Sequence, residues 1–219
     1  MKGSRGAACL LPAGGLDISK TTGQFIVMAQ PSHREQLVAA GTEMLRVKGF
    51  NGCSVEDITR AANVPKGSFY NHFESKDGLG KVALDRYWTR INRLQELLED
   101  RTLSPTDRLR GYFAALCDGF SQRQFHGGCL IGNFSLELSE QSASIRERLR
   151  EIFTDWTRAI ESCLKDAQVV GQLRPDVDVR ELAEFLINAF EGAVLRAKVE
   201  KTGTALDCFM KLTFSKILA

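Results

Sequence analysis

The sequence predicts an all-α fold, and three of its features support that prediction. Apolar residues recur mainly at spacings of three and four, which is the period of an amphipathic helix, and no segment sustains the alternation of a half-buried strand. Proline is scarce, with five residues in 219, so few segments are barred from forming helix. A hydrophobic content of 43% suffices for a buried core and excludes general disorder.

The first two predicted helices are short and begin at recognisable caps. The first follows Ser32 and ends near residues 48–50, where Gly49 stands in the usual terminating place. The second begins at Ser54 and ends near Asn63, although Asp57 stands where a capping box prefers Glu or Gln. Both segments are expected to pack their apolar stripes into one small core.

Residues 63–76 predict a third helix suited to reading DNA. Pro65 fits a first helical position, and Phe69 and Phe73 lie four apart, so they can anchor one face in the core. The other faces then carry groups that can donate to phosphates and reach base edges: Lys66, Gly67, Ser68, Tyr70, Asn71 and His72. With the tight turn at Asn63, the three helices predict a helix-turn-helix unit whose last helix enters the major groove.

Residues 37–84 resemble the TetR family of one-component bacterial repressors. The segment 54–58 (SVEDI) is similar to the family's Thr-hydrophobic-x-x-Ile pattern, and 67–73 (GSFYNHF) is similar to its Gly-x-hydrophobic-Tyr-x-His-Phe core. The resemblance implies groove contacts from Lys66, Gly67, Ser68 and Asn71, and backbone phosphate contacts from Tyr70, His72 and Lys76. It also places Ser54 and Thr59 near the phosphates, and it alone favours repression over activation.

Six further helical segments are predicted after the helix-turn-helix unit. They are expected over 76–98, from Ser104 to a break at 126–128, over 129–138, from 142 or 144 to 167, from Asp178 onward, and through 206–217. We therefore predict a flexible N-terminal extension over 1–30, a DNA-binding domain over 31–77, and a helical effector-binding and dimerisation domain over 78–219. Residues 1–27 are expected to be dispensable, because Met28 offers a second plausible start.

The last two predicted helices have broad apolar faces and small residues that allow close helix approach. Such faces suit a homodimer interface, although an intramolecular core explains them as well. Resemblance to the TetR family, whose members typically dimerise through their last two long helices, favours the interface. The predicted interface residues are Phe185, Ala189, Phe190, Ala193, Leu206, Phe209 and Met210. A two-fold dimer implies a palindromic operator in double-stranded DNA.

The segment 127–134 (GGCLIGNF) resembles the Gly-Cys-Leu-x-x-Asn signature of a TetR subgroup that includes repressors answering to electrophiles and to acrylate-type compounds. By that resemblance Cys129 inherits a sensing role. Its position at a helix amino terminus is expected to lower the thiol pKa. The alternative is that Cys129 lines a pocket or fills the core, as free cysteines often do.

An effector pocket is expected among the middle helices. A mostly apolar pocket with few polar groups suits a small organic compound, although each candidate also fits a core position. The candidates are Cys129, Phe113, Cys117, Phe120, Phe125, Asn133, Phe134 and Trp156. The six cysteines include no C-x-x-C pair, so neither a zinc site nor any cofactor is predicted.

Charge and missing motifs limit the remaining function classes. The formal net charge is only +2, and residues 31–90 carry 9 basic against 7 acidic groups, too small an excess to argue DNA binding by itself. No phosphate loop, nucleophile elbow or His-Glu-x-x-His is found, so an enzyme is not predicted. No segment is apolar for long enough to span a membrane, and a cytoplasmic protein is expected.

We therefore expect a DNA-binding transcriptional regulator. Most simply it is a dimeric repressor that leaves its operator when an effector binds or when a cysteine is modified. The alternative is a helical thiol-based stress or ligand-binding protein that does not bind DNA. A salt-dependent, sequence-selective interaction with DNA separates the two hypotheses.

Overall fold

The computed structural model describes residues 31–218, and every regular element in that range is helical, which confirms the all-α prediction. The predicted extension over 1–30 lies outside the described residues, and the boundary at residues 77 and 78 remains a prediction. The helices are α1 (His33–Lys48), α2 (Val55–Ala61), α3 (Lys66–Tyr70), α4 (Lys76–Asn92), α5 (Glu96–Glu99), α6 (Pro105–Ser121), α7 (Leu130–Leu138), α8 (Ala143–Val169), α9 (Val179–Glu200) and α10 (Thr204–Leu212).

The predicted caps at the first two helices form through side-chain hydrogen bonds. Ser32 and Glu35 close a reciprocal capping box at the start of α1. Ser54 and Asp57 close another at α2, so Asp serves where Glu or Gln is commoner. Hydrogen bonds from the Ser54 hydroxyl and amide hold the pKa of Asp57 down at about 2.

Three helix boundaries differ from the prediction. The third helix, predicted within residues 63–76, covers only Lys66–Tyr70, and Pro65 is the cap residue before it rather than its first helical residue. The predicted helix over 76–98 is divided, because a 3₁₀ turn at Arg93–Gln95 separates α4 from α5. A 3₁₀ turn has about three residues per turn and so rotates the face that follows it. A π-helical turn over Thr213–Ile217 continues α10.

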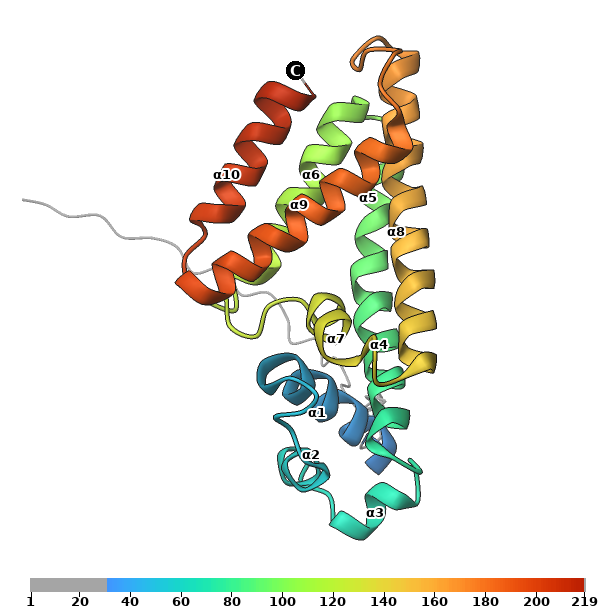
Figure 1. Cartoon of the computed structure of the whole chain (residues 1–219), viewed down its shortest axis with the longest axis vertical. Helices are drawn as coiled ribbons and strands as arrows, with labels where there is room; N and C mark the ends of the chain where they lie inside the picture. Colours follow the sequence, from blue (N-terminus) through green and yellow to red (C-terminus); the bar gives the residue numbers. More distant parts are fainter. Residues whose placement is uncertain (1–30, 219) are drawn as a thin grey trace, which may run out of the picture. The chain divides into compact units, whose positions relative to one another are not determined.

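The helices α1, α2 and α3 form a three-helix unit, from which α4 leads away along α8 (Figure 1). The short α7 packs on α1, α4 and α8, so it lies between the three-helix unit and the remaining helices. On the other side, α9 packs between α8 and α10. The position of α7 makes it the structural link between the two parts of the chain.

An aromatic core fills the region where α6, α8, α9 and α10 meet. The ring of Phe113 lies 5.6 Å from that of Phe190 and 5.0 Å from that of Phe209, and Trp156 lies 6.3 Å from Phe190. Burial on this scale stabilises the fold by about 1.5–3 kcal/mol for each large side chain. The cluster therefore holds these four helices together.

That core corrects two sets of predicted residues. Four predicted pocket residues are 0–6% exposed: Phe113, Phe120 and Trp156 pack within this core, and Phe134 is buried against Phe50 instead. Three predicted interface residues are likewise buried by their own chain, namely Phe190, Leu206 and Phe209. Sequence periodicity identifies apolar faces, but it does not separate a face covered by the same chain from one left for a partner.

Candidate DNA interface and effector pocket

The third helix presents a polar surface on a firmly anchored base. Phe69 is fully buried and Phe73 is 6% exposed, with ring centroids 5.5 Å apart. Asn63, with a φ of 53°, supplies the left-handed residue of the turn before α3. Around this base, side chains on α3 and just after it face solvent, namely Lys66, Tyr70, Asn71 and His72.

Among the predicted DNA contacts, Gly67 allows close approach, whereas Ser68 and Lys66 have neighbours within the three-helix unit. At Gly67 an added Cβ would have no heavy atom of the protein within 4 Å, so the backbone is open to an approaching surface. The hydroxyl of Ser68 lies 3.0 Å from the His33 ring on α1. Lys66 pairs with Glu56 at 3.6 Å, and because both side chains are 60% exposed, solvent screens the pair.

The structure gives different roles to Thr59 and Lys76, and both predictions need correction. Thr59 is 3% exposed and its hydroxyl donates to the Glu56 carbonyl, so it is withdrawn from the surface. The Lys76 ammonium donates to the carbonyls of Phe50 and Cys53 at 2.9 and 3.0 Å. It also lies 4.1 Å from the centre of the Phe50 ring, so Lys76 holds the α1–α2 loop. Ser54 stays exposed, with its hydroxyl in the α2 cap.

Two consecutive glycines carry the chain from α6 into α7. Gly127 and Gly128 have φ values of 81° and 67°, in a backbone region that residues other than glycine rarely adopt. A Cβ on Gly127 would clash with the guanidinium of Arg46, and one on Gly128 would lie 3.0 Å from the Lys198 side chain. The glycines therefore allow α1, α7 and α9 to approach one another.

Side chains of α7 cap the carboxyl end of α1, where backbone groups lack partners within the helix. The Asn133 amide donates to the Arg46 carbonyl at 2.9 Å and to the Gly127 carbonyl at 2.8 Å. One turn later, the Glu137 carboxylate accepts from the amides of Phe50 and Asn51 at 3.1 and 2.8 Å. Arg46 in turn donates to the His126 carbonyl. These bonds fasten α7 to the three-helix unit.

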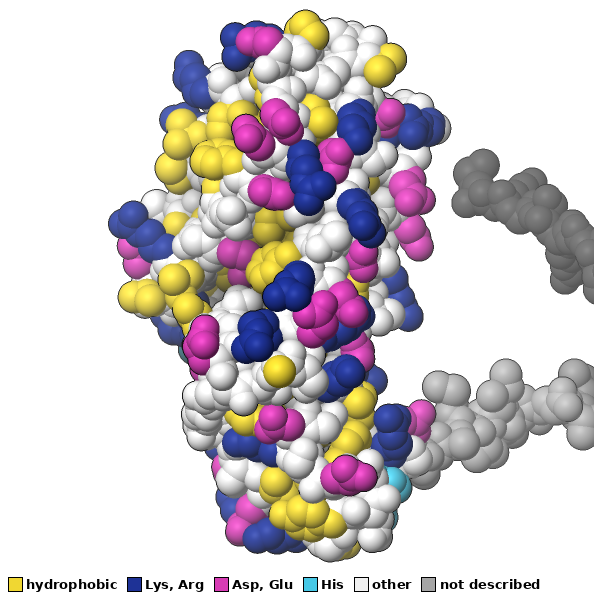
Figure 2. Space-filling view, turned by 45° about the vertical axis from the view of Figure 1, so that its right-hand side comes forward, with side chains coloured by type: hydrophobic (Ala, Val, Ile, Leu, Met, Phe, Trp, Pro, Cys, Tyr) yellow, Lys and Arg dark blue, Asp and Glu magenta, His cyan; other side chains and the backbone are white. Residues whose placement is uncertain are grey.

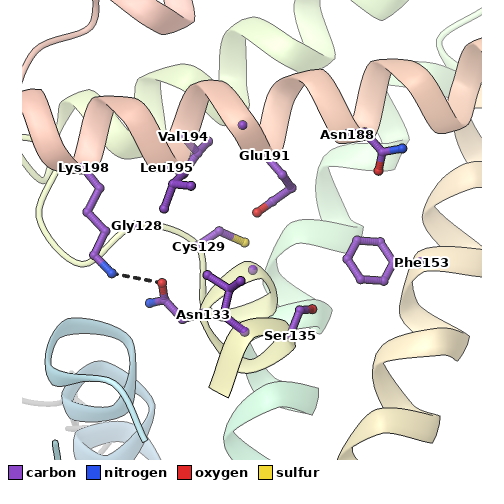
Figure 3. Close-up of a pocket in the computed structure, with 13 residues that line it drawn as sticks. Gly128, Cys129, Asn133, Ser135, Phe153, Asn188, Glu191, Val194, Leu195 and Lys198 are labelled. Atoms are coloured by element: carbon purple, nitrogen blue, oxygen red, sulfur yellow. Dashed lines mark hydrogen bonds between the residues drawn. The ribbon is translucent and has the colours of Figure 1, made fainter. Parts of the chain in front are cut away.

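A pocket of about 270 Å³ lies on the opposite side of α7, between α7 and α9 (Figure 3). Two predicted effector residues, Cys129 and Asn133, line it, whereas Cys117 and Phe125 do not. Other lining residues are Ser135 and Leu136 of α7, Phe153 of α8, and Asn188, Glu191, Leu195 and Lys198 of α9. The walls are largely apolar, with a few polar groups at the edges.

Asn133 joins this pocket to the cap of α1. Its side-chain oxygen accepts a hydrogen bond of 3.0 Å from the Lys198 ammonium (Figure 3). Its side-chain nitrogen donates to the carbonyls of Arg46 and Gly127. Asn133 is only 9% exposed, so solvent competes little for these bonds. One side chain thus connects α9, the pocket and the end of α1.

The thiol of Cys129 faces the carboxyl of Glu191 across the pocket (Figure 3). Burial, together with the neighbouring Glu191, raises the pKa of Cys129 well above its usual value. The predicted lowering by the helix amino terminus is therefore wrong, because desolvation outweighs the helix dipole. Burial also raises the pKa of Glu191 to about 7, and its Oε1 has no hydrogen-bond partner among the described residues.

Four residues at this junction were not predicted from the sequence: Arg46, Glu137, Glu191 and Lys198. Glu191 could have been identified from the sequence, because an acidic residue directly after Phe190 interrupts a largely apolar stretch of α9. The others gave none, because polar residues near helix ends are common and their partners lie far away in sequence. The hydrogen bond between Lys198 and Asn133, for example, spans 65 positions.

The outer face of α9 exposes large apolar side chains. Phe185 is 52% exposed, Leu195 51% and Val199 75%. Ala189, Ala193 and Met210 of the predicted interface are half-buried, and at Gly192 an added Cβ would meet no heavy atom within 4 Å. Phe185, Gly192, Leu195 and Val199 lie seven, three and four positions apart, so they follow one another along a single stripe. We call these four residues the α9 stripe.

Elsewhere, basic and acidic side chains are interspersed over the face in Figure 2, in keeping with the small net charge. Among residues 31–218, no helix is long and apolar enough to cross a membrane. The features that point to function are therefore local: the exposed surface of α3, the α7 junction and the pocket beside it.

A three-helix unit with an exposed third helix, joined to a helical bundle with its own pocket, defines a helix-turn-helix transcriptional regulator. The chain belongs to the TetR family. Residues 37–81 match the family model for bacterial regulatory proteins of the tetR family, and residues 105–213 match the model for a tetracyclin repressor-like C-terminal domain. The family's members bind DNA as dimers and respond to small-molecule effectors.

Relatives agree with this assignment over most of their length. The transcriptional repressor DhaR of Mycobacterium sp. strain GP1 is 41% identical over 192 residues, covering 87% of this chain and 95% of DhaR. The crystal structure of a TetR regulatory protein from Rhodobacter sphaeroides is 34% identical, with a TM-score of 0.81, covering 85% of this chain and 99% of its own. The reduced form of Escherichia coli NemR is 29% identical, with a TM-score of 0.76, covering 85% and 97%. These relatives are regulators, and the alternative of a helical protein without DNA binding is set aside.

Proposed function

We propose that this regulator is a repressor released from its operator by a small organic effector that binds between α7 and α9. The observation that carries the proposal is the position of Asn133. This residue lines the pocket and also caps the carboxyl end of α1 through its bond to Arg46. A ligand that moves α7 or Lys198 therefore acts on the three-helix unit without having to touch it.

The energy for release comes from a difference in effector affinity between two conformations of the chain. In the conformation described here, Asn133 and Glu137 hold the end of α1 and the loop after it. An effector that displaces the Lys198 ammonium from Asn133 loosens this junction. The third helix then changes its orientation relative to the rest of the chain.

On DNA, we propose that Lys66, Gly67, Ser68 and Asn71 face the major groove, with Tyr70, His72 and Ser54 near the phosphates. A two-fold dimer places its two recognition helices about 34 to 36 Å apart, one turn of B-DNA, so the operator is palindromic. We assign the dimer contact to the α9 stripe with Ala189, Ala193 and Met210. Gly192 and Leu195 also line the pocket, so a partner seated there borders the effector site.

The sensing chemistry favours non-covalent binding over modification of Cys129. Thiolate is the reactive form of cysteine, and burial beside Glu191 disfavours it. The pocket is small and mainly apolar, which suits a compact organic molecule with one or two polar groups. Attack of an electrophile on Cys129 is the second route, supported by the resemblance of residues 127–134 to the electrophile-responsive subgroup.

The test is binding to the intergenic DNA upstream of the protein's own gene, measured in a salt titration. Wild type, Cys129→Ser and Lys66→Ala are compared with and without N-ethylmaleimide, and Cys208→Ser serves as the control for an exposed thiol. We expect specific binding that weakens with salt and in Lys66→Ala, and that persists after treatment. Release by the reagent in wild type but not in Cys129→Ser would establish the covalent route instead. Absence of sequence-selective binding to this DNA and to a random pool would overturn the repressor proposal.

A further inference from the structure

A second cavity, unrelated to the pocket at Cys129, lies between α1 and α4. It has a volume of about 390 Å³, within the usual range for small-molecule sites. Its walls include four arginines, namely Arg46, Arg86, Arg90 and Arg93, together with Glu43 and Tyr87. So many guanidinium groups around one hollow are unusual in a chain whose formal net charge is only +2.

Three of these arginines lack a carboxylate partner. Arg86 and Arg90 lie one turn apart on α4, and Arg93 is the first residue of the 3₁₀ turn that follows it. None of them forms an ion pair with any acidic side chain in residues 31–218, although 14 other pairs are present there. Arg90 instead lies 5.2 Å from the centre of the Tyr87 ring. Their charges are therefore left for a partner outside the described chain.

The surroundings add positive charge, and Glu35, an acid outside the cavity that feels the charge of Arg86, is already engaged with Ser32 in the cap of α1. Burial, with Arg90 and Arg46 close by, lowers the pKa of Arg123. The single acid at the cavity, Glu43, is already held by the Arg46 guanidinium, whose hydrogen bonds are the main cause of its lowered pKa. Residues 1–30 contain only one acidic residue, Asp17, against three basic ones, so they cannot neutralise the cluster. Mutual repulsion favours the binding of an anion here.

We propose that this cavity binds a phosphate-bearing small molecule whose phosphoryl oxygens are held by Arg86, Arg90 and Arg93. The guanidinium group is planar and presents paired donors that match phosphate oxygens. Operator phosphates do not reach it easily. Arg90 lies 14 positions beyond Lys76 at the start of α4, a rise of roughly 21 Å along a helix.

The cavity and the effector pocket have no lining residue in common, but both border the junction between α1 and α7. Arg46 lines the cavity with its side chain, while its carbonyl accepts the hydrogen bond from Asn133. Tyr87 also lines the cavity, and burial, together with the neighbouring Cys129 thiol, raises the pKa of its phenol. A bound phosphate therefore acts on the same junction between α1 and α7 as a ligand beside Cys129.

The experiment is isothermal titration of the full-length protein with sodium pyrophosphate at constant ionic strength, in the absence of DNA. Citrate is titrated in parallel as a carboxylate probe. The variant Arg86→Gln/Arg90→Gln changes two exposed side chains, and Arg158→Gln on α8 is the control, since Arg158 is 73% exposed and does not line the cavity. Circular dichroism of each variant checks that the helices are retained.

We expect saturable pyrophosphate binding that weakens at least tenfold in the double variant and stays unchanged in Arg158→Gln. No saturable binding in wild type, or an equal loss in Arg158→Gln, would overturn the site. Citrate binding without pyrophosphate binding would overturn the assignment to phosphate. If the double variant lost operator affinity while wild type bound no pyrophosphate, the arginines would belong to the DNA footprint and the proposal would fail.

Discussion

The side-chain amide of Asn133 donates a 2.9 Å hydrogen bond to the main-chain carbonyl of Arg46, 87 positions earlier in the sequence. That carbonyl belongs to the last turn of α1, where helix geometry leaves it without an intrahelical partner. Asn133 is therefore both a helix cap and a pocket residue. The bond ties the orientation of the three-helix unit to the state of the pocket.

Replacing Asn133 with alanine should lower the free energy of unfolding by about 1–3 kcal/mol, because the carbonyls of Arg46 and Gly127 would lose their donor in a buried place. Urea unfolding monitored by circular dichroism measures the change. Asn188→Ala is the control, since Asn188 lines the same pocket but is exposed and makes no side-chain hydrogen bond within residues 31–218. Equal losses in both variants would contradict the capping role.

Glu191 should make stability depend on pH. Its folded pKa of about 7 lies above the ordinary value of 4.5, so between these values the folded state binds more protons than the unfolded state. Wild-type stability therefore falls as pH rises through this window. In Glu191→Gln that penalty is absent, and its advantage over wild type should grow by about 2–3 kcal/mol from pH 5 to pH 8.

Urea unfolding of wild type and Glu191→Gln at the two pH values measures the effect. Glu184→Gln, an exposed position on the same helix, controls for the loss of one acidic charge from α9. A constant difference between Glu191→Gln and wild type at both pH values would show that the Glu191 carboxyl is not desolvated in the folded protein.

Thiol reactivity should follow exposure rather than helix position. Cys208 is exposed, whereas Cys129 is 3% exposed with a raised pKa. N-ethylmaleimide at pH 7 should alkylate Cys208 at least ten times faster than Cys129, because the thiolate at Cys129 is both scarce and shielded. Mass spectrometry of peptides taken during the reaction gives both rates. Faster labelling at Cys129 would instead support an electrophile sensor.

A charge within the α9 stripe should disrupt the dimer. Leu195 is 51% exposed in the single chain, so Leu195→Glu can be accommodated by the monomer but not by a desolvated interface. Sedimentation should show a weakened dimer, and circular dichroism should show that the helices are retained. Leu103→Glu is the control, because Leu103 is 48% exposed in the loop before α6. Unchanged association of Leu195→Glu would move the interface away from the α9 stripe.

Local patterns predicted the helices well, because caps, apolar spacing and glycine breaks act over a few residues. The caps at Ser32 and Ser54 and the break at Gly127 are of this kind, and all three appear in the structure. The alternation of buried Phe69 and Phe73 with exposed Tyr70 and Asn71 also follows from helical spacing, although α3 itself ends at Tyr70. Such features need no knowledge of distant residues.

Roles that depend on tertiary contacts were harder to predict. Lys76 was predicted to contact DNA phosphates, but its ammonium donates hydrogen bonds to the carbonyls of Phe50 and Cys53, more than 20 positions away. The thiol pKa of Cys129 was expected to be lowered by its position at a helix amino terminus, but burial against the neighbouring α9 raises it. Phe190 and Phe185 belong to the same apolar face in sequence, yet one is 1% exposed and the other 52%. Only the packed chain distinguishes them.

The hydrogen bonds from α7 to residues more than 80 positions earlier also affect the order in which the chain becomes stable during synthesis. Residues 31–77 leave the ribosome well before Asn133 and Glu137, so the final turn of α1 and the loop after it are first made without the groups that complete their hydrogen bonds. The nascent three-helix unit is therefore frayed where α1 ends until α7 has been translated. A fragment cut at residue 77 keeps that defect permanently, whereas one extended through Leu138 supplies both missing partners.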